Sequence, residues 1–230
     1  MTSSILASDL WIVIPAFNEA QVIGSVIGDV GRFSRHVVVV DDCSTDGTAA
    51  VAAAAGATVL RHALNRGAGA AMQTGFAYAL RKGAGAIITF DSDGQHRGDD
   101  LPALYAPIAA GTADFALGSR FLGTSGSVPP LRRLLLRVAT VFTRATSGLR
   151  VTDAHNGLRA FSRGGAEKID IRLDRFAHCS EIMDQIRSSG LPYVEVPVLV
   201  LYTPYSRRKG QRGTAAVRVA FDYLIGRWVQ

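Results

Sequence analysis

Short apolar, β-branched runs alternate with segments of helical periodicity through much of the chain, and this alternation restricts the fold more than any other feature. The runs are Leu10–Pro15, His36–Val40, Ala57–Leu60, Ala86–Phe90 and Ala113–Leu117, and each has the length and composition of a buried strand. Apolar residues between them recur at helical spacing, which predicts helices over residues 20–33, 48–55, about 71–82 and 100–109. The alternation predicts an α/β fold whose mostly parallel sheet carries helices on both faces.

Two aspartates, Asp91 and Asp93, stand directly after the fourth predicted strand, with one small residue between them. Side chains alternate along an extended chain, so both carboxylates leave on one side, beyond the strand's C-terminal end, where open α/β sheets bind ligands. Two carboxylates aimed at one point suit Mg²⁺ or Mn²⁺ that also holds a diphosphate, and Gln95 has the parity to add a carbonyl oxygen. A solvated turn is the alternative, because Asp, Ser and Gly are ordinary turn residues.

Other segments with polar or glycine-rich sequences are expected at the same edge of the sheet. The first strand runs into Pro15-Ala16-Phe17-Asn18-Glu19 and the second into Asp41-Asp42, while Gly67 and Gly69 precede a helix. Glycines before a helix N-terminus suit the close approach of an anion, although helix–sheet packing explains the same glycines equally well. Because these segments would meet at one edge with Asp91, the sequence favours a ligand site over a solvated turn.

Charge is unevenly distributed along the chain. Lysine and arginine number 25 against 19 acidic residues, which gives a net charge of +6. No acidic residue occurs from Phe115 to Thr152 or from Tyr202 to Val217, yet arginines recur in both stretches, a pattern that suggests a polyanion, an anionic membrane or phosphorylated substrates. The two cysteines match no metal or disulfide spacing, so a reducing compartment is expected. The chain shows no signal-peptide pattern and no apolar run of about 18 residues, so neither a leader nor a transmembrane helix is expected.

Residues 128–148 combine an apolar stripe of near-helical period with arginines beside it. The stripe is Leu131, Leu134, Leu135, Val138, Val141 and Phe142, and the arginines are Arg132, Arg133, Arg137 and Arg144. Such a basic amphipathic helix lies in a membrane interface, unless its stripe packs on the core. A second amphipathic segment lies near the C-terminus, with a dimer contact as its alternative role. The predicted organisation is one domain over residues 1–212, which contains the 128–148 helix, and a C-terminal amphipathic helix over 213–230.

Five motifs, in this order and spacing, resemble the inverting family 2 glycosyltransferases, and the chain is most similar to their polyprenyl-phosphate, or dolichol-phosphate mannosyltransferase, type. The motifs are Ile-Pro-Ala-Phe-Asn-Glu (14–19), Val-Asp-Asp-Cys-Ser-Thr-Asp-Gly-Thr (40–48), Asn-Arg-Gly-Ala-Gly-Ala-Ala (65–71), Phe-Asp-Ser-Asp-Gly-Gln-His (90–96) and Gly-Ser-Arg-Phe (118–121). Further matches follow at 152–161 and 194–198, so the resemblance spans roughly residues 10–210.

The resemblance implies a GT-A fold, which is Rossmann-like, and a nucleotide-sugar donor. It places the nucleobase and ribose against Pro15, Phe17, Asn18 and Glu19, with Asp42 facing the base, Asp41 as its structural partner and Arg66 near the base or phosphates. The metal and diphosphate match Asp91, Asp93 and Gln95, with Ser92 in the same motif where the family often has Ala. Asp93, Arg120, Arg208 and Lys209 are the implied catalytic residues, the three cations lying near the donor and acceptor phosphates.

Several polar residues further along the chain are candidates for binding the acceptor or the sugar. Asp153, Asn156 and Glu181 could form hydrogen bonds with sugar hydroxyls, and Arg132 could hold the acceptor phosphate. Glu181 follows His178 by three residues; this pair could hold a metal, but its spacing is typical of a pair on a helix surface. The basic run at Arg208 and Lys209 has a solvated charge run as its alternative interpretation.

The resulting functional hypothesis is a metal-dependent transfer of a hexose from a UDP- or GDP-sugar to a polyprenyl phosphate, by a cytoplasmic enzyme peripheral to the inner face of the membrane. A phosphate acceptor is largely ionised near neutral pH, with a second pKa of about 6, so it needs cations more than a base. The chain lacks the Gln-x-x-Arg-Trp motif of processive members that use hydroxyl acceptors, which favours the phosphate. Partners besides donor, acceptor and anionic membrane include a second copy or a separate membrane protein, and no nucleic acid is expected.

Three alternatives to this hypothesis stay open. The same fold could transfer a sugar to a hydroxyl of a saccharide or other small molecule. The chain could also be a non-catalytic nucleotide-binding protein, although the intact pair of Asp91 and Asp93 argues against that. A nucleotidyltransferase is a distant option, because the Gly-rich N-terminal loop with Arg and Lys that such enzymes use is missing.

Overall fold

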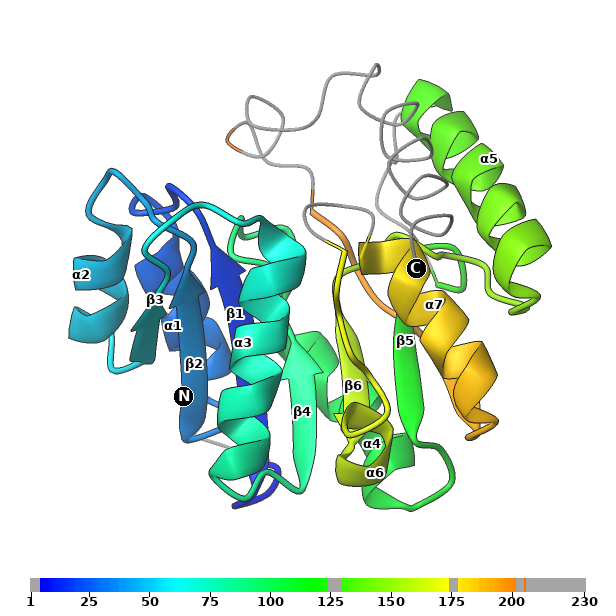
Figure 1. The fold of residues 1–230 in the computed structure, drawn as a ribbon, viewed down its shortest axis with the longest axis horizontal. Coiled ribbons are helices and arrows are strands. Elements are labelled where there is room, and N and C mark those ends of the chain that lie inside the picture. Colours follow the sequence, from blue (N-terminus) through cyan, green and yellow to red (C-terminus); the bar gives the residue numbers. More distant parts are fainter. Residues whose placement is uncertain (1–4, 124–129, 174–177, 202–204, 206–230) are drawn as a thin grey trace.

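The computed structural model describes residues 5–123, 130–173, 178–201 and 205. A mixed sheet of seven strands, in the order β3-β2-β1-β4-β6-β5-β7, forms its centre (Figure 1). The strands are β1 Leu10–Ala16, β2 His36–Asp41, β3 Thr58–Arg61, β4 Ala86–Thr89, β5 Phe115–Ser119, β6 Arg159–Ser162 and β7 Tyr193–Pro197.

The first four strands are mutually parallel, as the alternating pattern predicts. β1 pairs with β2 and β4, and β2 pairs with β3, all in parallel. β6 lies between β4 and β5 and is antiparallel to both, whereas β7 is parallel to β5. The sheet is therefore mostly parallel, and β6 is an antiparallel insertion that the strand pattern did not predict.

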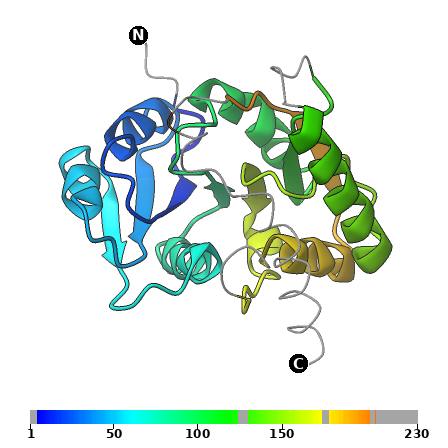
Figure 2. The same ribbon diagram turned by 90° about the horizontal axis from the view of Figure 1, so that it is seen from above.

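Helices cover both faces of this sheet, as Figure 2 shows from above. They are α1 Ile23–Val30, α2 Thr48–Ala54, α3 Ala68–Arg81, the 3₁₀ helix η1 Gly98–Asp100, α4 Leu101–Ala109, α5 Pro130–Ser147, α6 Arg163–Ala166 and α7 His178–Ser189. Apolar side chains of α1, α2 and α4 form one core with the sheet, and those of α3, α6 and α7 form a second core on the opposite face. The alternation along β1 fits this division, since Ile12 and Ile14 enter the first core and Trp11 and Val13 the second.

Several element boundaries differ from the predicted ones by a few residues. The first helix begins at Ile23 rather than at residue 20, because the amides of Val22 and Ile23 both donate to the carbonyl of Glu19 and close a turn there. β5 starts two residues later than predicted, because its register is set by pairing with β6 and β7. These shifts leave the predicted polar segments at the C-terminal ends of β1, β2, β4 and β5.

Helix α5 stands above the edge of the sheet where the parallel strands end, and packs against α7 (Figure 1). It combines a basic composition with a strongly sided distribution of apolar residues. In the part of the chain that the structure describes, no helix combines the length and the apolarity needed to cross a membrane.

Candidate active site

The loops that follow β1 and β2 are held to one another by hydrogen bonds. The amide of Asn18 donates to Oγ of Ser44 (2.9 Å), and the amide of Thr45 donates back to Oδ1 of Asn18 (2.9 Å). Asn18 and Cys43 both adopt the left-handed region, at φ 54° and 64°, which costs energy for residues other than glycine and concentrates at functional sites. Phe17 remains 44% exposed beside them. The predicted nucleotide-binding loop is therefore a fixed structure with an aromatic ring open to solvent.

Asp42, the predicted base-facing residue, fastens the loop that leads into α3. Its Oδ1 accepts hydrogen bonds from Nδ1 of His62 (2.8 Å) and the amide of Arg66 (3.0 Å). Its Oδ2 accepts one from the amide of Gly67 (2.6 Å). The side chain of Arg66 is exposed, so it can turn toward a ligand.

Asp41, to which the resemblance assigns a structural role, contacts Ser44 and Arg61. Its buried Oδ1 accepts the amide of Ser44 (3.2 Å), and its Oδ2 lies 3.1 Å from Nε of Arg61, an ion pair that lacks hydrogen-bond geometry. Both aspartates at the end of β2 are thus engaged with the backbone of the neighbouring loops.

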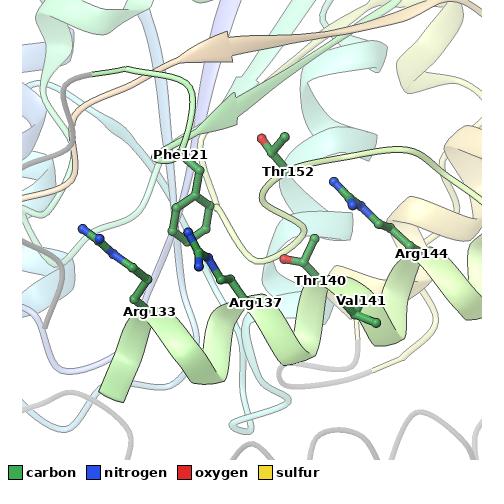
Figure 3. A pocket seen from close by; sticks show the side chains of 7 residues that line it. All are labelled: Phe121, Arg133, Arg137, Thr140, Val141, Arg144 and Thr152. Carbon is green, nitrogen blue, oxygen red and sulfur yellow. The ribbon is translucent and has the colours of Figure 1, made fainter. Parts of the chain in front are cut away.

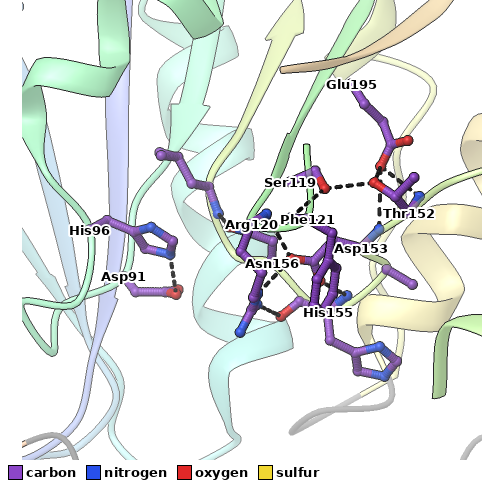
Figure 4. A network of polar contacts seen from close by, with 12 residues as sticks. Asp91, His96, Ser119, Arg120, Phe121, Thr152, Asp153, His155, Asn156 and Glu195 are labelled. Atoms are coloured by element: carbon purple, nitrogen blue, oxygen red, sulfur yellow. Dashed lines mark hydrogen bonds and ion pairs between the residues drawn. The ribbon is translucent and has the colours of Figure 1, made fainter. Parts of the chain in front are cut away.

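Asp91 is held on two sides at the C-terminal end of β4. Nε2 of the buried His96 lies 3.1 Å from its Oδ2 (Figure 4). On the other side, a Cβ atom at position 157 would fall 2.2 Å from its Oδ1, so a residue larger than glycine there would have to displace the carboxylate. The carbonyl of Gly157 accepts a hydrogen bond from Oγ1 of Thr89 (2.6 Å), which fixes this segment to β4. Asp93 follows, and its Oδ1 accepts the amide of Gln95 (3.0 Å).

The two carboxylates influence one another's ionisation. Burial and the charge of Asp91 raise the pKa of Asp93 to about 6. Burial opposes ionisation of Asp91 too, but the hydrogen bond and charge of His96, with the charge of Arg159, hold its pKa below the ordinary value. A cation between the carboxylates would relieve this repulsion. No group of three His, Cys, Asp or Glu within the described ranges could hold a metal by itself, so other ligands would have to complete the coordination sphere.

Arg120 and Asp153 form a buried ion pair. Nε of Arg120 lies 2.5 Å from Oδ2 of Asp153, and the two side chains are 6% and 0% exposed. Nη2 of Arg120 also donates to the carbonyl of His155 (3.1 Å). The structure thus brings together two residues that were predicted to act separately, one on phosphates and one on the sugar.

A second set of hydrogen bonds holds the segment that carries Asp153, as Figure 4 shows. Oε1 of Glu195 on β7 accepts from both the amide (2.7 Å) and the hydroxyl (2.8 Å) of Thr152. Oγ of Ser119 lies 2.6 Å from Oγ1 of Thr152. The ends of β5 and β7 therefore position residues 152–156 next to the Asp91 site.

Buried polar atoms without a hydrogen-bond partner gather near Asp91. Within the described residues, these atoms include Nδ1 of His96, Nδ1 of His155, Nδ2 of Asn156 and Nη1 of Arg159. Oδ1 of Asn156 accepts the amide of Leu158 (3.0 Å), so the amide plane is fixed and Nδ2 is left without an acceptor. Burial lowers the pKa of His155 to about 4, with a contribution from Arg159, so this ring is neutral near pH 7. Of these atoms, Nδ2 of Asn156 and Nη1 of Arg159 are hydrogen-bond donors, and both could bind oxygen atoms of a ligand.

Glu181 is engaged elsewhere. Its carboxylate accepts hydrogen bonds from the amides of Arg172 (3.0 Å) and Leu173 (2.9 Å). Glu181 and His178 are both buried, at 7% and 4% exposure, so the interpretation of this pair as a helix-surface pair is wrong. The fold buries α7's first turn because α7 packs under α5 and against α3.

A cavity of about 480 Å³ lies between α5 and the loops after β5 and before β6 (Figure 3). Arg133, Arg137 and Arg144 rise into it from α5, opposite Phe121 and Thr152. Nε of Arg144 also donates to the carbonyl of Val151 (2.6 Å). Three cations beside an aromatic ring suit an anionic group that carries apolar substituents.

Three residues of the apolar stripe of α5 are exposed. Leu134, Val138 and Val141 are 60%, 59% and 62% exposed, whereas Thr140 and Thr143 are buried. The alternative in which these three residues pack on the core is therefore wrong.

Known proteins are similar to this chain in sequence. The sequence model for glycosyl transferase family 2 matches residues 11–170. The chain belongs to glycosyl transferase family 2. It is 34% identical over 200 residues to the polyprenol monophosphomannose synthase of Mycolicibacterium smegmatis, covering 81% of this chain and 75% of that protein. It is 27% identical over 238 residues to the UDP-N-acetylglucosamine–dolichyl-phosphate N-acetylglucosaminyltransferase of Methanococcus voltae, covering 94% of this chain and 95% of that protein.

The fold of the glycosyltransferase also resembles a solved structure. Glucosyl-3-phosphoglycerate synthase from Mycobacterium tuberculosis, solved in complex with Mn²⁺, uridine diphosphate and phosphoglyceric acid, superposes with a TM-score of 0.72 at 20% identity, covering 95% of this chain and 78% of that one. This likeness confirms the predicted GT-A fold. The resemblance to family 2 and its polyprenyl-phosphate members is likewise confirmed.

Some predicted site residues of the glycosyltransferase fall outside what the structure describes. Arg208, Lys209 and the C-terminal segment 213–230 lie outside the described residues, and so does the side chain of Arg132. Tyr205 is described, and its hydroxyl lies 2.6 Å from Oε2 of Glu19, across the end of β1. Burial and the Glu19 carboxylate raise the pKa of Tyr205, which keeps the phenol protonated as the donor in this bond.

Four residues of this site carry no role in the sequence prediction: His62, His96, Gly157 and Arg159. His96 directly follows Gln95 in the acidic motif, and this position next to the predicted metal ligands could have marked it as a site residue. Gly157 could be found only from its contact with Asp91, which is distant in sequence. Arg159 is 1% exposed, and no pattern in a sequence distinguishes a buried arginine from an exposed one.

Proposed function

We propose that this glycosyltransferase moves a hexose from a nucleotide-sugar to a polyprenyl phosphate, with Mg²⁺ or Mn²⁺ bound, at the cytoplasmic face of a membrane. One observation carries this proposal. The arginines of α5 and Val141 line a cavity beside Thr152, while the same helix leaves Leu134 and Val138 exposed to solvent. An acceptor that joins a phosphate to a long apolar chain is the ligand that needs both surfaces at once.

The residues at the end of β4 fit a divalent cation. Asp91 and Asp93 offer two hard oxygen ligands, and Gln95 is close in sequence. Burial and the charge of Asp91 raise the pKa of Asp93, and a cation would offset both effects. When bound, the cation would neutralise charge on the diphosphate leaving group. The unpaired donors of Asn156 and Arg159 would hold oxygens of the sugar or the diphosphate.

The acceptor phosphate would supply its own nucleophile. A lone pair of the ionised phosphate oxygen forms the new bond to the anomeric carbon, and the bond from that carbon to the diphosphate oxygen breaks with its electron pair. Inversion follows because attack and departure occur on opposite faces of the sugar. Arg133, Arg137 and Arg144, with the predicted Arg132, Arg208 and Lys209, would orient the acceptor and offset its charge.

A hydroxyl acceptor would need a general base, and two nearby carboxylates are poorly placed to act as one. Asp153 is tied to Arg120, and Glu181 is tied to the amides of residues 172–173. The relatives that this chain resembles are named for polyprenol and dolichyl phosphates, which supports the same acceptor class. They differ in the sugar they are named for, so the hexose stays open.

The test is a panel of UDP- and GDP-sugars with Mn²⁺ or Mg²⁺, incubated with the full chain and either undecaprenyl phosphate or simple saccharides. Sugar found on the lipid phosphate, and absent with Asp93→Asn, supports the proposal. Sugar found on a saccharide instead would show that the acceptor is a saccharide hydroxyl and not a polyprenyl phosphate. Nucleotide binding without transfer to any acceptor would contradict catalysis by this chain.

A further inference from the structure

A single oxygen of Glu195, in the middle of β7, receives three hydrogen bonds from the segment between α5 and β6. Oε1 of Glu195 accepts the amide of Thr152 (2.7 Å), the hydroxyl of Thr152 (2.8 Å) and the amide of Asp153 (3.3 Å). Residues 152 and 153 lie outside the strands of the sheet, and Asp153 is 2% exposed. Because backbone amides removed from water need an acceptor, this carboxylate oxygen determines where the segment lies.

The hydroxyl of Thr152 extends this contact to β5. A carboxylate only accepts hydrogen bonds, so the hydroxyl of Thr152 gives its one hydrogen to Glu195. Ser119 must therefore be the donor in its 2.6 Å bond with Thr152. Oγ of Ser119 in turn accepts the amide of Phe121 (3.2 Å). The hydrogen bonds thus run in one direction, from Phe121 to Glu195, along the residues that Figure 4 shows together.

This chain of hydrogen bonds carries one wall of the cavity beside α5. Phe121 and Thr152 line the cavity opposite Arg133 and Arg137 (Figure 3). Glu195 is half-buried on β7 and contacts this wall through Thr152. A change at Glu195 therefore alters the shape of the cavity while its arginines remain.

The same segment reaches the predicted cation site at its other end. Gly157 lies against Asp91, and its carbonyl accepts a hydrogen bond from Oγ1 of Thr89 (2.6 Å). Residues 152–157 thus connect the cavity wall to the end of β4, with Glu195 holding one end and Thr89 the other. Loss of the Glu195 contact would release the end at the cavity and leave the end at the cation site held.

We propose that Glu195 is a positioning residue for the acceptor, because it holds Phe121 and Thr152 where an anionic group in the cavity is aligned with the donor. This inference rests on the proposed function, which places the acceptor phosphate in that cavity. A misplacement of about 1 Å is enough to slow a reaction about 100-fold. Binding of the cation and the donor depends on the end of the segment at Gly157, so it should not change.

The experiment is steady-state kinetics of the full chain with Mn²⁺ and its nucleotide-sugar, with undecaprenyl phosphate varied in detergent micelles. Glu195→Leu is expected to lower kcat/KM for the lipid phosphate about 10- to 100-fold, the scale of hydrogen bonds to a charged group. The KM for the nucleotide-sugar should stay within about twofold of the wild-type value. Glu195→Gln keeps an accepting oxygen at the place of Oε1 and should restore kcat/KM to within about fivefold of wild type.

Two further variants separate positioning from a weakened fold. Val194→Ala removes packing from the neighbouring position of β7 and leaves the hydrogen bonds of residues 152 and 153 in place, so kcat/KM for the lipid phosphate should match wild type. Ser119→Ala interrupts the chain of hydrogen bonds between Phe121 and Thr152 by removing one oxygen. It should lower the same kcat/KM about fivefold, the scale of one neutral hydrogen bond.

Wild-type kcat/KM for the lipid phosphate in Glu195→Leu would overturn the proposal, and so would an equal loss in Val194→Ala. A Glu195→Gln variant as impaired as Glu195→Leu would overturn the role of the hydrogen bonds. If Glu195→Leu does not fold, wild-type kinetics of Ser119→Ala would decide against the proposal. Wild-type protein without lipid-dependent turnover would overturn the proposed function and this inference with it, whereas lipid-dependent turnover that no variant changes would overturn this inference alone.

Discussion

Nε2 of His96 lies 3.1 Å from Oδ2 of Asp91, and the ring of His96 is itself fixed by burial and by an edge-on contact with Phe90 at 5.8 Å between ring centroids. The predicted metal ligand is therefore oriented by a histidine five residues further along the chain. Partners of this kind fix a ligand's orientation and tune its basicity, and their loss weakens metal binding without removing a ligand.

Replacing His96 should therefore weaken cation binding while both carboxylates remain. We expect His96→Leu to lower the Mn²⁺ affinity of the protein about 10- to 100-fold, because the Asp91 carboxylate loses its fixed orientation. Electron paramagnetic resonance of free Mn²⁺ in a titration measures this. His36→Leu, which changes a histidine stacked on Trp11 away from the site, is the matched control. Equal affinities for His96→Leu and wild type would remove the positioning role.

Gly157 should be intolerant of even one added methyl group. A Cβ atom there would meet Asp91 Oδ1 at 2.2 Å, so Gly157→Ala must displace the carboxylate or the 156–158 segment. We expect a loss of Mn²⁺ affinity of about tenfold or more with the fold retained. Gly164→Ala is the control, since its Cβ would have no neighbour closer than 3.8 Å. If the two alanine variants bind Mn²⁺ with equal affinity, the close contact between residue 157 and Asp91 does not affect cation binding.

Cation binding should depend on pH through Asp93. Its pKa is raised to about 6 by burial and by Asp91, and a proton on this carboxylate competes with the cation. Affinity is therefore expected to be full above pH 6 and to fall as the pH drops below it, by up to about tenfold per pH unit. Calorimetric titrations of Mn²⁺ at several pH values measure this, and Asp93→Asn should lack the step. A wild-type affinity that does not change across pH 6 would contradict the assignment.

The ion pair between Arg120 and Asp153 should matter for stability. Both side chains are nearly inaccessible, so Asp153→Ala leaves a buried guanidinium without its carboxylate. We expect the free energy of unfolding in urea to fall by about 3–5 kcal/mol. Asp170→Ala breaks an ion pair whose partners are more than half exposed and should cost about 1 kcal/mol or less. If both variants lower the free energy of unfolding by the same amount, the buried ion pair does not stabilise the protein more than the exposed pair does.

The basic face of α5 should bind anionic membranes. Replacing Arg132, Arg133 and Arg137 with glutamine is expected to weaken binding to phosphatidylserine-containing vesicles in low salt by about fivefold per arginine, with the difference shrinking as salt is added. Co-sedimentation with the vesicles measures this. A variant with Arg81 and Lys82 changed to glutamine, at the far end of α3 from this face, is the control. Unchanged binding of the α5 variant would argue against a membrane role for the helix.

The alternating runs were sufficient to predict the parallel half of the sheet, because a run such as Val37–Val40 is apolar throughout and buried on both faces. β6 was missed for a physical reason. It has four residues and begins with Arg159, and its strand conformation depends on pairing with β4 and β5 rather than on its own composition.

The site was predictable where neighbouring residues in the sequence carry it. The spacing of Asp91 and Asp93 places both at the end of β4, and their mutual effect on ionisation agrees with that. The partners of these residues were not predictable, because tertiary packing selects them. His62 reaches Asp42 across 20 residues, and Arg120 reaches Asp153 across 33. The sequence also named Asp153 and Glu181 for the sugar without showing that other groups already engage them.

The most direct test of the central claim is the release of nucleoside diphosphate by the full chain, measured with Mn²⁺ and a nucleotide-sugar, with and without undecaprenyl phosphate. Release that depends on the lipid phosphate and yields a sugar-phospholipid is the predicted result. Release that is independent of the lipid phosphate but increases when a saccharide is added would contradict transfer to a polyprenyl phosphate.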